Sequence, residues 1–505
     1  MNKFESAFQK EMNSTYTENG ALSNKSTLNY LLDFFSQAGA MRNRSEGEIL
    51  EVWHKAMIEN KELAFRLLFY FRDVRAGQGE RRLFKIIFEY LCEYYPEDAS
   101  RIISLVPFYG RWDDLFVGIG TPTEVEIVTF IKKTFESDRA AFLRGGEISL
   151  LAKWLPSVST HGKKKPLAKF FIKAFSMNEA FYRKTLSRLR KQLELVESKM
   201  SDNRWDEINY SKVPSQAMSK LYSAFYRNDG ERFEEFLNEV EEGTKEIKAG
   251  TLYPYQLVKK AMQNKGDTVK SLNAQWKALP EFCEEYDNTM VIVDVSGSMT
   301  MGAGDIQPIF MSIGLGLYLA ERNTGFFKNK FMTFSSNPEL VDVIGNNLWE
   351  KVSFMNQANW GGSTNLQASF DMILSAAVKN NVPQSDMPKR MIIISDMEFD
   401  SGTGIYWGRE AKDDFDKTNR SLIAEKYNRA GYELPELVWW NVDARNPQYP
   451  MTKNEVGLMV SGNSPEIMKS VIKDEIITPE QIMMDVAQRE RYDLVSQHLG
   501  YFEKI

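Results

Sequence analysis

The chain has 505 residues, of which 43% are hydrophobic and 26% are charged. A single hydrophobic core seldom grows to this size, so the length predicts two or three domains, and the composition excludes a disordered or fibrous protein. The two cysteines and three histidines argue against a disulfide scaffold, a His-rich zinc site and a Ser-His-Asp hydrolase. No apolar run is long enough to cross a bilayer, and the N-terminal residues lack the apolar core of a signal peptide. We therefore expect a cytoplasmic protein with no membrane partner.

Helical periodicity dominates the first part of the chain. Apolar side chains recur at helical intervals, and the predicted helical stretches are 47–72, 123–142, 166–176, 179–200, 215–228 and 230–248. Helix pairs of about 35–45 residues are typical of an α-solenoid of HEAT-like repeats. We predict such a helical-repeat domain over 1–275, which could close into a ring. Within 179–200, leucines in a 3-4-3-4 spacing indicate a buried stripe, with a coiled coil as the alternative.

The pattern changes after about Gly266. Short apolar, β-branched runs recur at 289–293, 330–334, 391–395, 437–442 and 457–460, and helical patterns separate most of them. This alternation predicts a doubly wound, mostly parallel sheet, with 339–344 as an antiparallel edge strand. The fold class is then multidomain α plus α/β, with the α/β domain over 286–475. A C-terminal helix within 479–505 is expected to pack back on the helical domain.

Oxygen-bearing side chains gather where predicted strands end. Asp294, Ser296 and Ser298 follow one strand, Asp396 follows another, and Thr364 lies in a Gly-rich segment before a helix. Ligands of open α/β sheets bind outside the carboxyl ends of the strands, and carboxylates and hydroxyls are the hard ligands that Mg²⁺, Mn²⁺ or Ca²⁺ prefer. We predict a divalent-metal site with one position open to an acidic group of a protein partner. A polar turn without metal is the alternative.

This set resembles the metal-ion-dependent adhesion site, or MIDAS, of von Willebrand factor A domains. The resemblance rests on Asp294-x-Ser296-x-Ser298, on Thr364 after two glycines, and on Asp396 after an Ile-rich strand. It implies that these five residues bind the metal, expected to be Mg²⁺, directly or through water. A metallohydrolase is disfavoured because no general base other than the ligands is evident and hydroxyl ligands polarise water less than zinc does. We therefore expect no enzymatic activity.

Positive charge gathers in one segment of the predicted helical domain. Residues 151–200 hold 12 Lys or Arg and 3 Glu, which gives 12 − 3 = +9 in a chain of net charge −6. RNA backbones bind cations that are presented on one face, so the segment predicts an RNA-binding surface. A solvated helix face and a surface for an acidic protein are the alternatives. The candidate RNA-binding residues are Lys163, Lys164, Lys165, Lys169, Arg183, Lys184, Arg188, Arg190 and Lys191.

Three further motifs punctuate the helical half: Phe71–Arg82, Tyr109–Leu115 and Leu151–Pro156. The first has two glycines before a helix but lacks the Gly-Lys-Ser/Thr of a P-loop, so we expect a helix–helix turn with buried Arg–carboxylate pairs. In the second, Trp112 is expected to anchor one repeat on the next, with the two aspartates capping a helix.

These motifs, together with the metal motif, resemble the Ro autoantigen family, which joins a TROVE-type ring of helical repeats to an A domain. They also resemble uncharacterised A-domain proteins of bacteria, phages and plants. Ro proteins bind small structured RNAs and the ends of misfolded ones, so the resemblance implies such RNA partners. We expect a Ro-like RNA-binding protein whose A domain recruits a protein partner through the metal. The alternative is a metal-dependent scaffold or assembly factor with no RNA role.

Overall fold

The computed structural model describes residues 3–158, 164–263, 269–282, 286–301, 307–333, 337–357, 365–400, 405–406, 409–410, 418–472 and 478–501. The chain divides into two compact units. Unit 1 comprises Met1–Phe71, Ala76–Gln78 and Ala249–Tyr492, and unit 2 comprises Arg72–Arg75, Gly79–Lys248 and Asp493–Ile505. This division differs from the boundaries predicted at 275 and 286, because the N-terminal residues pack with the sheet.

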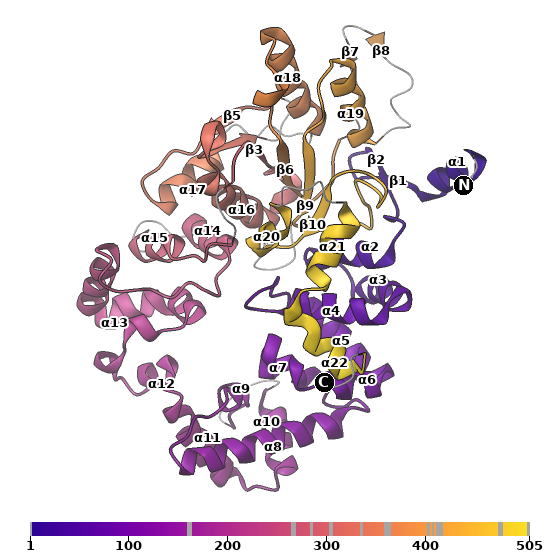
Figure 1. The fold of residues 1–505 in the computed structure, drawn as a ribbon. Helices are drawn as coiled ribbons and strands as arrows, with labels where there is room; N and C mark the ends of the chain where they lie inside the picture. The colour runs from indigo at the N-terminus through magenta and orange to yellow at the C-terminus, as the bar shows by residue number, and fades with distance from the viewer. Residues whose placement is uncertain are drawn as a thin grey trace. The chain divides into compact units, whose positions relative to one another are not determined.

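Unit 1 is built on a six-stranded sheet of order β10-β9-β6-β3-β4-β5 (Figure 1). Its strands are β3 (Thr289–Val293), β4 (Lys330–Thr333), β5 (Leu340–Asp342), β6 (Arg390–Ser395), β9 (Glu436–Asn441) and β10 (Leu458–Ser461). All neighbouring pairs are parallel except β4 and β5, which are antiparallel. Counted along the chain, the order is 3-2-1-4-5-6, the doubly wound arrangement. The predicted mostly parallel sheet and its antiparallel edge strand are confirmed.

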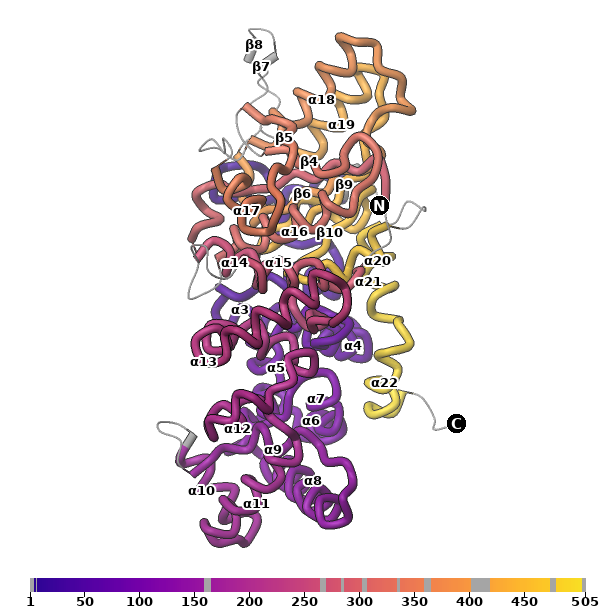
Figure 2. Tube along the Cα trace, turned by 90° about the vertical axis from the view of Figure 1, so that its left-hand side faces the viewer, coloured from indigo at the N-terminus to yellow at the C-terminus, as the bar shows by residue number. Residues whose placement is uncertain are grey.

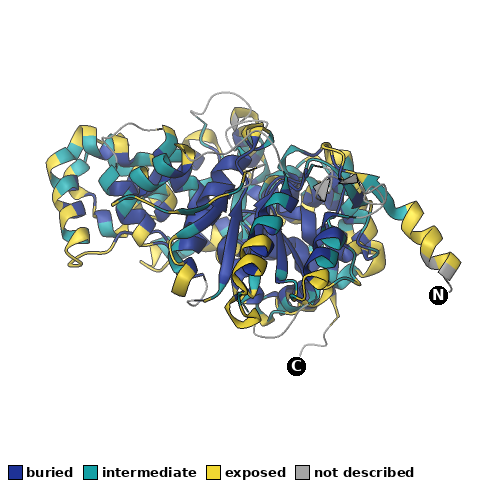
Figure 3. Ribbon diagram, turned by 90° about the horizontal axis from the view of Figure 1, so that it is seen from above, coloured by how far each residue is buried: buried dark blue, intermediate teal, exposed yellow. Residues whose placement is uncertain are grey.

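The central strands are buried on both faces because helices cover the sheet (Figure 3). α16 (Pro308–Arg322) packs on β3, β4 and β6, and it is buried around nearly its whole circumference, as an all-apolar helix must be. The other helices of the sheet region are α17 (Leu348–Gln357), α18 (Leu366–Asn380), α19 (Asn419–Arg429), α20 (Met468–Val471) and α21 (Pro479–Ala487). Two short strands, β7 (Ile405–Tyr406) and β8 (Arg409–Glu410), pair with each other.

Helices α14 (Pro254–Gln263) and α15 (Val269–Lys277) belong to unit 1 although their periodicity suggested the helical half. α14 packs on α16 and α17. The approach is close: a Cβ on Gly314 of α16 would lie 2.8 Å from the Tyr255 backbone nitrogen. Glycine at this position therefore allows α14 to join the sheet region.

The N-terminal segment is also part of unit 1. Its elements are α1 (Lys3–Asn13), β1 (Ser14–Tyr16), β2 (Leu22–Asn24), α2 (Tyr30–Ala38), α3 (Glu46–Glu59) and α4 (Lys61–Arg72). The Asn24 N–H donates to the Tyr449 carbonyl at 3.0 Å, and the Tyr449 N–H donates back at 2.9 Å. α2 lies against β10, and β1 pairs with β2 in a hairpin that helical periodicity did not predict.

Unit 2 is helical. Its main helices are α5 (Arg82–Tyr94), α6 (Pro96–Ile102), α7 (Leu105–Tyr109), α8 (Glu124–Leu143), α9 (Leu151–Trp154), α10 (Lys164–Ala174), α11 (Glu179–Gln192), α12 (Val196–Ser201), α13 (Ser215–Glu241) and α22 (Asp493–Leu499). Figure 2 shows α8, α10 and α11 beside one another, and α11 contacts both of the others. Ring closure of the helices stays a prediction.

Three predicted helices are interrupted in the structure. The stretch 179–200 is two helices, with Glu194 at a φ of +46° between them, so the leucine stripe is not a continuous coiled coil. α13 is kinked at Asp229. The C-terminal stretch is also two helices, and α22 packs on α6 of unit 2. Within the described residues, no helix has both the length and the apolar character that crossing a bilayer requires.

Candidate functional sites

The two predicted carboxylate ligands come together at one edge of the sheet. Asp294 directly follows β3 and Asp396 directly follows β6, and these strands are parallel neighbours with Val293 opposite Ile394. Between β3 and β6 the strand order reverses direction, which is where open α/β sheets bind ligands. The topology therefore places both carboxylates at the position that the fold reserves for a ligand.

Local hydrogen bonds hold the predicted ligands of the first loop in place. The Ser395 hydroxyl donates to Asp294 Oδ2 at 2.6 Å, and the Ser296 N–H donates to Asp294 Oδ1 at 2.9 Å. The hydroxyl oxygens of Ser296 and Ser298 lie 3.0 Å apart. Adjacent ligands of an octahedral Mg²⁺ with bonds of about 2.1 Å would be separated by about 3 Å. The two hydroxyls are thus spaced as neighbouring ligands of such an ion.

Burial makes this pair of carboxylates electrostatically unfavourable without a cation. Asp294 is fully buried and Asp396 is nearly so. Burial and the adjacent Asp396 charge raise the pKa of Asp294. Burial also raises the pKa of Asp396, although the Arg445 guanidinium opposes this effect. A divalent cation would offset both penalties, so the residues fit the ion that the motif implies.

Residues beyond the predicted set also surround the centre. Arg445 donates to Asp396 Oδ2 and lies 3.3 Å from a carboxylate oxygen of Asp443. Burial raises the pKa of Asp443 to about 6, and the Asn43 amide donates to this carboxylate at 2.9 Å. Asp443 and Arg445 follow strand β9, so the rule that ligands gather at strand ends could have identified them. Asn43 gave no such signal, because 400 residues separate it from Asp443.

Glu398, which follows Asp396 by two residues, is tied to the N-terminal segment. Its carboxylate accepts the Glu18 N–H at 2.7 Å and the Asn446 amide at 2.9 Å. Its own N–H donates to Asp396 Oδ1 at 3.2 Å. Glu398 therefore links Asp396 to the N-terminal segment and to the loop after β9.

Thr364, the fifth predicted ligand, lies outside the described residues. Among those described, no group of three or more His, Cys, Asp or Glu side chains is placed to hold a metal. The centre at the sheet edge differs from such a group, because its donors are two carboxylates and two hydroxyls. Metal binding by these residues stays a prediction.

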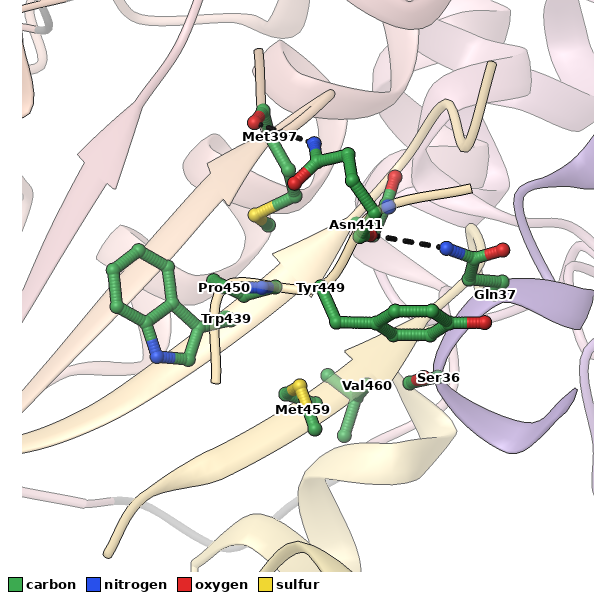
Figure 4. Close-up of a pocket in the computed structure, with 10 residues that line it drawn as sticks. Ser36, Gln37, Met397, Trp439, Asn441, Tyr449, Pro450, Met459 and Val460 are labelled. Carbon is green, nitrogen blue, oxygen red and sulfur yellow. Dashed lines mark hydrogen bonds between the residues drawn. The ribbon is translucent and has the colours of Figure 1, made fainter. Parts of the chain in front are cut away.

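A small cavity lies near the same edge of unit 1, bounded by α2, β9 and β10 (Figure 4). Gln37 Nε2 donates to the Gln448 carbonyl at 3.1 Å, and Gln448 Nε2 donates to the Met397 carbonyl at 2.8 Å. The cavity measures about 10 Å³, room for one water molecule at most. It is therefore too small to hold a substrate.

The candidate RNA-binding residues of unit 2 lie on two adjacent helices. α10 buries Ala168 and Phe171 and exposes Lys165, Lys169 and Lys173 at intervals of four residues. These three form a single stripe, which we call the lysine stripe. On α11 the exposed cations are Arg183, Lys184, Arg188 and Lys191. None of these seven side chains forms an ion pair with another described residue. Lys163 and the Lys164 side chain lie outside the described part of the chain.

Arg190 differs from the other candidates because its guanidinium is used inside unit 2. It donates to the Ala152 carbonyl at 2.8 Å, to the Leu155 carbonyl at 2.6 Å and to the Ser157 hydroxyl at 2.5 Å. It therefore fastens α11 to the segment that follows α9. Its inclusion among phosphate-binding residues is not supported by this geometry.

The three motifs of the helical half meet in one place, which we call the Arg–Asp cluster. Arg72 donates to the buried Asp114 at 2.5 and 2.9 Å. Arg81 bridges Asp113 and Asp114, at 2.5 and 2.8 Å. Arg111 donates twice to Asp113 and lies over the Trp154 ring, 4.0 Å from its centroid. The predicted buried Arg–carboxylate pairs are confirmed, and they join all three motifs.

The fold and the site define a class of protein: a doubly wound sheet with carboxylates and hydroxyls at its switch point, together with a helical unit. Residues 288–499 match the family model described as Domain of unknown function (DUF7788). Residues 17–106 and 172–285 match that described as Domain of unknown function (DUF2828). An uncharacterized protein of Acanthamoeba polyphaga mimivirus is 29% identical over 517 residues, covering 94% of this chain and 87% of that protein.

Among solved structures, the chain is similar to the crystal structure of the Deinococcus radiodurans RO (RSR) protein. The TM-score is 0.48 at 12% identity, covering 92% of this chain and 100% of that chain. Similarity at this level does not establish a shared function.

Proposed function

We propose that the protein binds structured RNA through unit 2 and recruits a carboxylate-bearing protein partner through a divalent cation, Mg²⁺, held by unit 1. Asp294, Ser296, Ser298 and Asp396 would hold the ion, with Thr364 as the fifth ligand implied by the MIDAS resemblance. The bound ion would supply positive charge and one exchangeable coordination position. A reaction is not part of this proposal, because the buried acids nearest the centre are already engaged by Arg445, Asn43 or backbone N–H groups.

The placement of Asp294 and Asp396 carries the metal half of the proposal. Two buried carboxylates side by side are costly unless a cation compensates them, and Arg445 contacts only Asp396 of the two. The nearby hydroxyls of Ser296 and Ser298 add oxygen ligands without adding charge. This donor set is the one that Mg²⁺ prefers.

The lysine stripe carries the RNA half of the proposal. Exposed cations repeated along one face of a helix can contact successive phosphates, and the stripe has no acidic partners among the described residues. The neighbouring cations of α11 extend the positive surface. The resemblance of the sequence motifs to the Ro family points to the same ligand class, small structured or misfolded RNA.

Reversing the stripe tests the RNA half. We expect Lys165→Glu/Lys169→Glu/Lys173→Glu to weaken binding of a fluorescein-labelled RNA hairpin at least tenfold in anisotropy titrations. Because each lost phosphate contact releases fewer counterions, the log–log dependence of affinity on salt should become shallower by about 0.7–0.9 per contact.

The matched control reverses three exposed lysines of unit 1, Lys328, Lys379 and Lys389. It changes the net charge of the protein by the same amount, so it should leave the affinity within about twofold if binding is local to unit 2. Equal losses in the two triple variants would show only a long-range charge effect and would contradict the assignment of the stripe.

The second candidate function is a metal-dependent scaffold without an RNA role. The observation that favours it is that the metal centre is complete in unit 1 without any contribution from the lysine stripe. A wild-type protein that binds no RNA hairpin at low salt, yet retains Mg²⁺, would leave this candidate standing.

A further inference from the structure

The Arg–Asp cluster contains one cation that its own carboxylates do not satisfy. Lys85 lies one helical turn after Arg81 and is half-buried. Its ammonium group makes no hydrogen bond or ion pair with any residue in the described part of the chain. Asp113 and Asp114 are already occupied by arginines. Lys85 is thus a cation held in place without an acceptor.

The charges of the cluster do not balance. Arg72, Arg81, Lys85 and Arg111 face Asp113 and Asp114, so the count is 4 − 2 = +2. Burial, followed by the charges of Arg81 and Arg111, lowers the pKa of Lys85, while the two aspartates oppose this effect. An isolated protein gains nothing from such an excess, because like charges held together at partial burial are unfavourable.

The excess charge is accessible and is shaped for an oxyanion. The side chains of Arg81 and Arg111 are 37% and 33% exposed. Trp154 fixes the plane of the Arg111 guanidinium by stacking, and Asp113 holds both arginines. Guanidinium groups fixed in this way present paired N–H donors that match phosphate oxygens, and an ammonium adds a third cationic donor.

We propose that Lys85, Arg81 and Arg111 form a phosphate-binding site for the RNA backbone, separate from the lysine stripe. The inference rests on the proposed RNA-binding function and identifies a second point of contact. Asp113 and Asp114 act as positioning residues, because they orient the arginines and do not touch the ligand. A bound phosphate would supply the acceptor that Lys85 lacks.

The test compares the full-length wild type with Lys85→Gln and with Lys133→Gln, an exposed lysine on α8 of the same unit. Affinity for the fluorescein-labelled RNA hairpin is measured by anisotropy over a range of salt concentrations. One lost charge-assisted contact should weaken binding by Lys85→Gln about tenfold and make the salt dependence shallower by about one unit of log–log slope. Lys133→Gln should match the wild type.

Thermal stability separates a binding role from a structural one. Because Lys85 bonds to no described side chain, Lys85→Gln should melt at or above the wild-type temperature, the pattern of a residue kept for function at some cost in stability. Sodium phosphate should raise the melting temperature of the wild type more than sodium chloride does at equal ionic strength, and this difference should shrink in Lys85→Gln. A variant that loses RNA affinity and also melts lower would overturn the inference.

The remaining outcomes distinguish this inference from the proposed function. If the reversed lysine stripe weakens hairpin binding while Lys85→Gln binds like the wild type, RNA binding stands and the phosphate site is refuted. If the wild type binds no hairpin at low salt, the proposed function fails and the inference with it. Loss of polyglutamate binding alone in Lys85→Gln would assign the cluster to an acidic protein, which also overturns it.

Discussion

Asp114 is the most heavily used carboxylate of unit 2. It is completely buried and accepts from Arg72 and Arg81, while Arg72 itself is 1% exposed. The neighbouring Asp113 is 21% exposed and pairs with arginines that remain in contact with solvent. The two adjacent aspartates therefore differ sharply in what their removal would leave behind.

We expect Asp114→Ala to lower the free energy of unfolding by about 3–5 kcal/mol, because it strands a buried guanidinium. Asp113→Ala should cost about 1 kcal/mol, since water can replace its contacts. Urea denaturation followed by circular dichroism measures both. Equal losses in the two variants would mean that the burial of Arg72 has no energetic role.

At the residue scale, the sequence predicted the metal ligands that lie at strand ends and missed those that tertiary packing delivers. Asp294 and Asp396 could be found because each directly follows an apolar run, and parallel strands end at the same edge. Arg445 carries the same signal after β9 but matches no metal-binding motif. Glu18 and Asn43 reach the centre from the far end of the sequence, and no local pattern marks them.

At the scale of elements, glycines decide which helices join the sheet. A Cβ on Gly39, just after α2, would lie 2.6 Å from the Ser461 carbonyl oxygen and 2.7 Å from Gly462 Cα. The Gly39 N–H also donates to the Ser461 hydroxyl at 3.1 Å. Helical periodicity predicted many of the helices of the chain but not this close approach, which is why α2, α3, α4, α14 and α15 were assigned to the helical half.

Gly39→Ala tests whether that approach matters. We expect it to lower the free energy of unfolding by about 1–3 kcal/mol, because the backbone of β10 cannot move aside. The control is Gly47→Ala in α3, where an added Cβ meets nothing within 4 Å. That substitution should stabilise the protein by a few tenths of a kcal/mol to about 1 kcal/mol, since alanine is the better helix former. Gly39→Ala as stable as the wild type would refute close packing of α2 on the strand.

At the scale of the whole molecule, the two proposed binding functions reside in different units. The metal centre draws all of its described residues from unit 1, and the lysine stripe and the Arg–Asp cluster belong to unit 2. The sequence predicted this division of functions although it placed the boundary elsewhere. The boundary was missed because unit 1 is discontinuous in sequence: its N-terminal part and its sheet are separated by most of unit 2.

Calorimetric titration of Mg²⁺ tests the central claim most directly. The wild type should bind at a single site that Asp294→Ala abolishes, because removing one of two buried carboxylates deletes a charged ligand. Asp386→Ala, an exposed aspartate of the same unit, should bind like the wild type. At a hundredfold excess over its Kd, the ion should stabilise the wild type by about 2.7 kcal/mol. A wild type that binds no Mg²⁺, or an Asp294→Ala variant with unchanged affinity, would contradict the account.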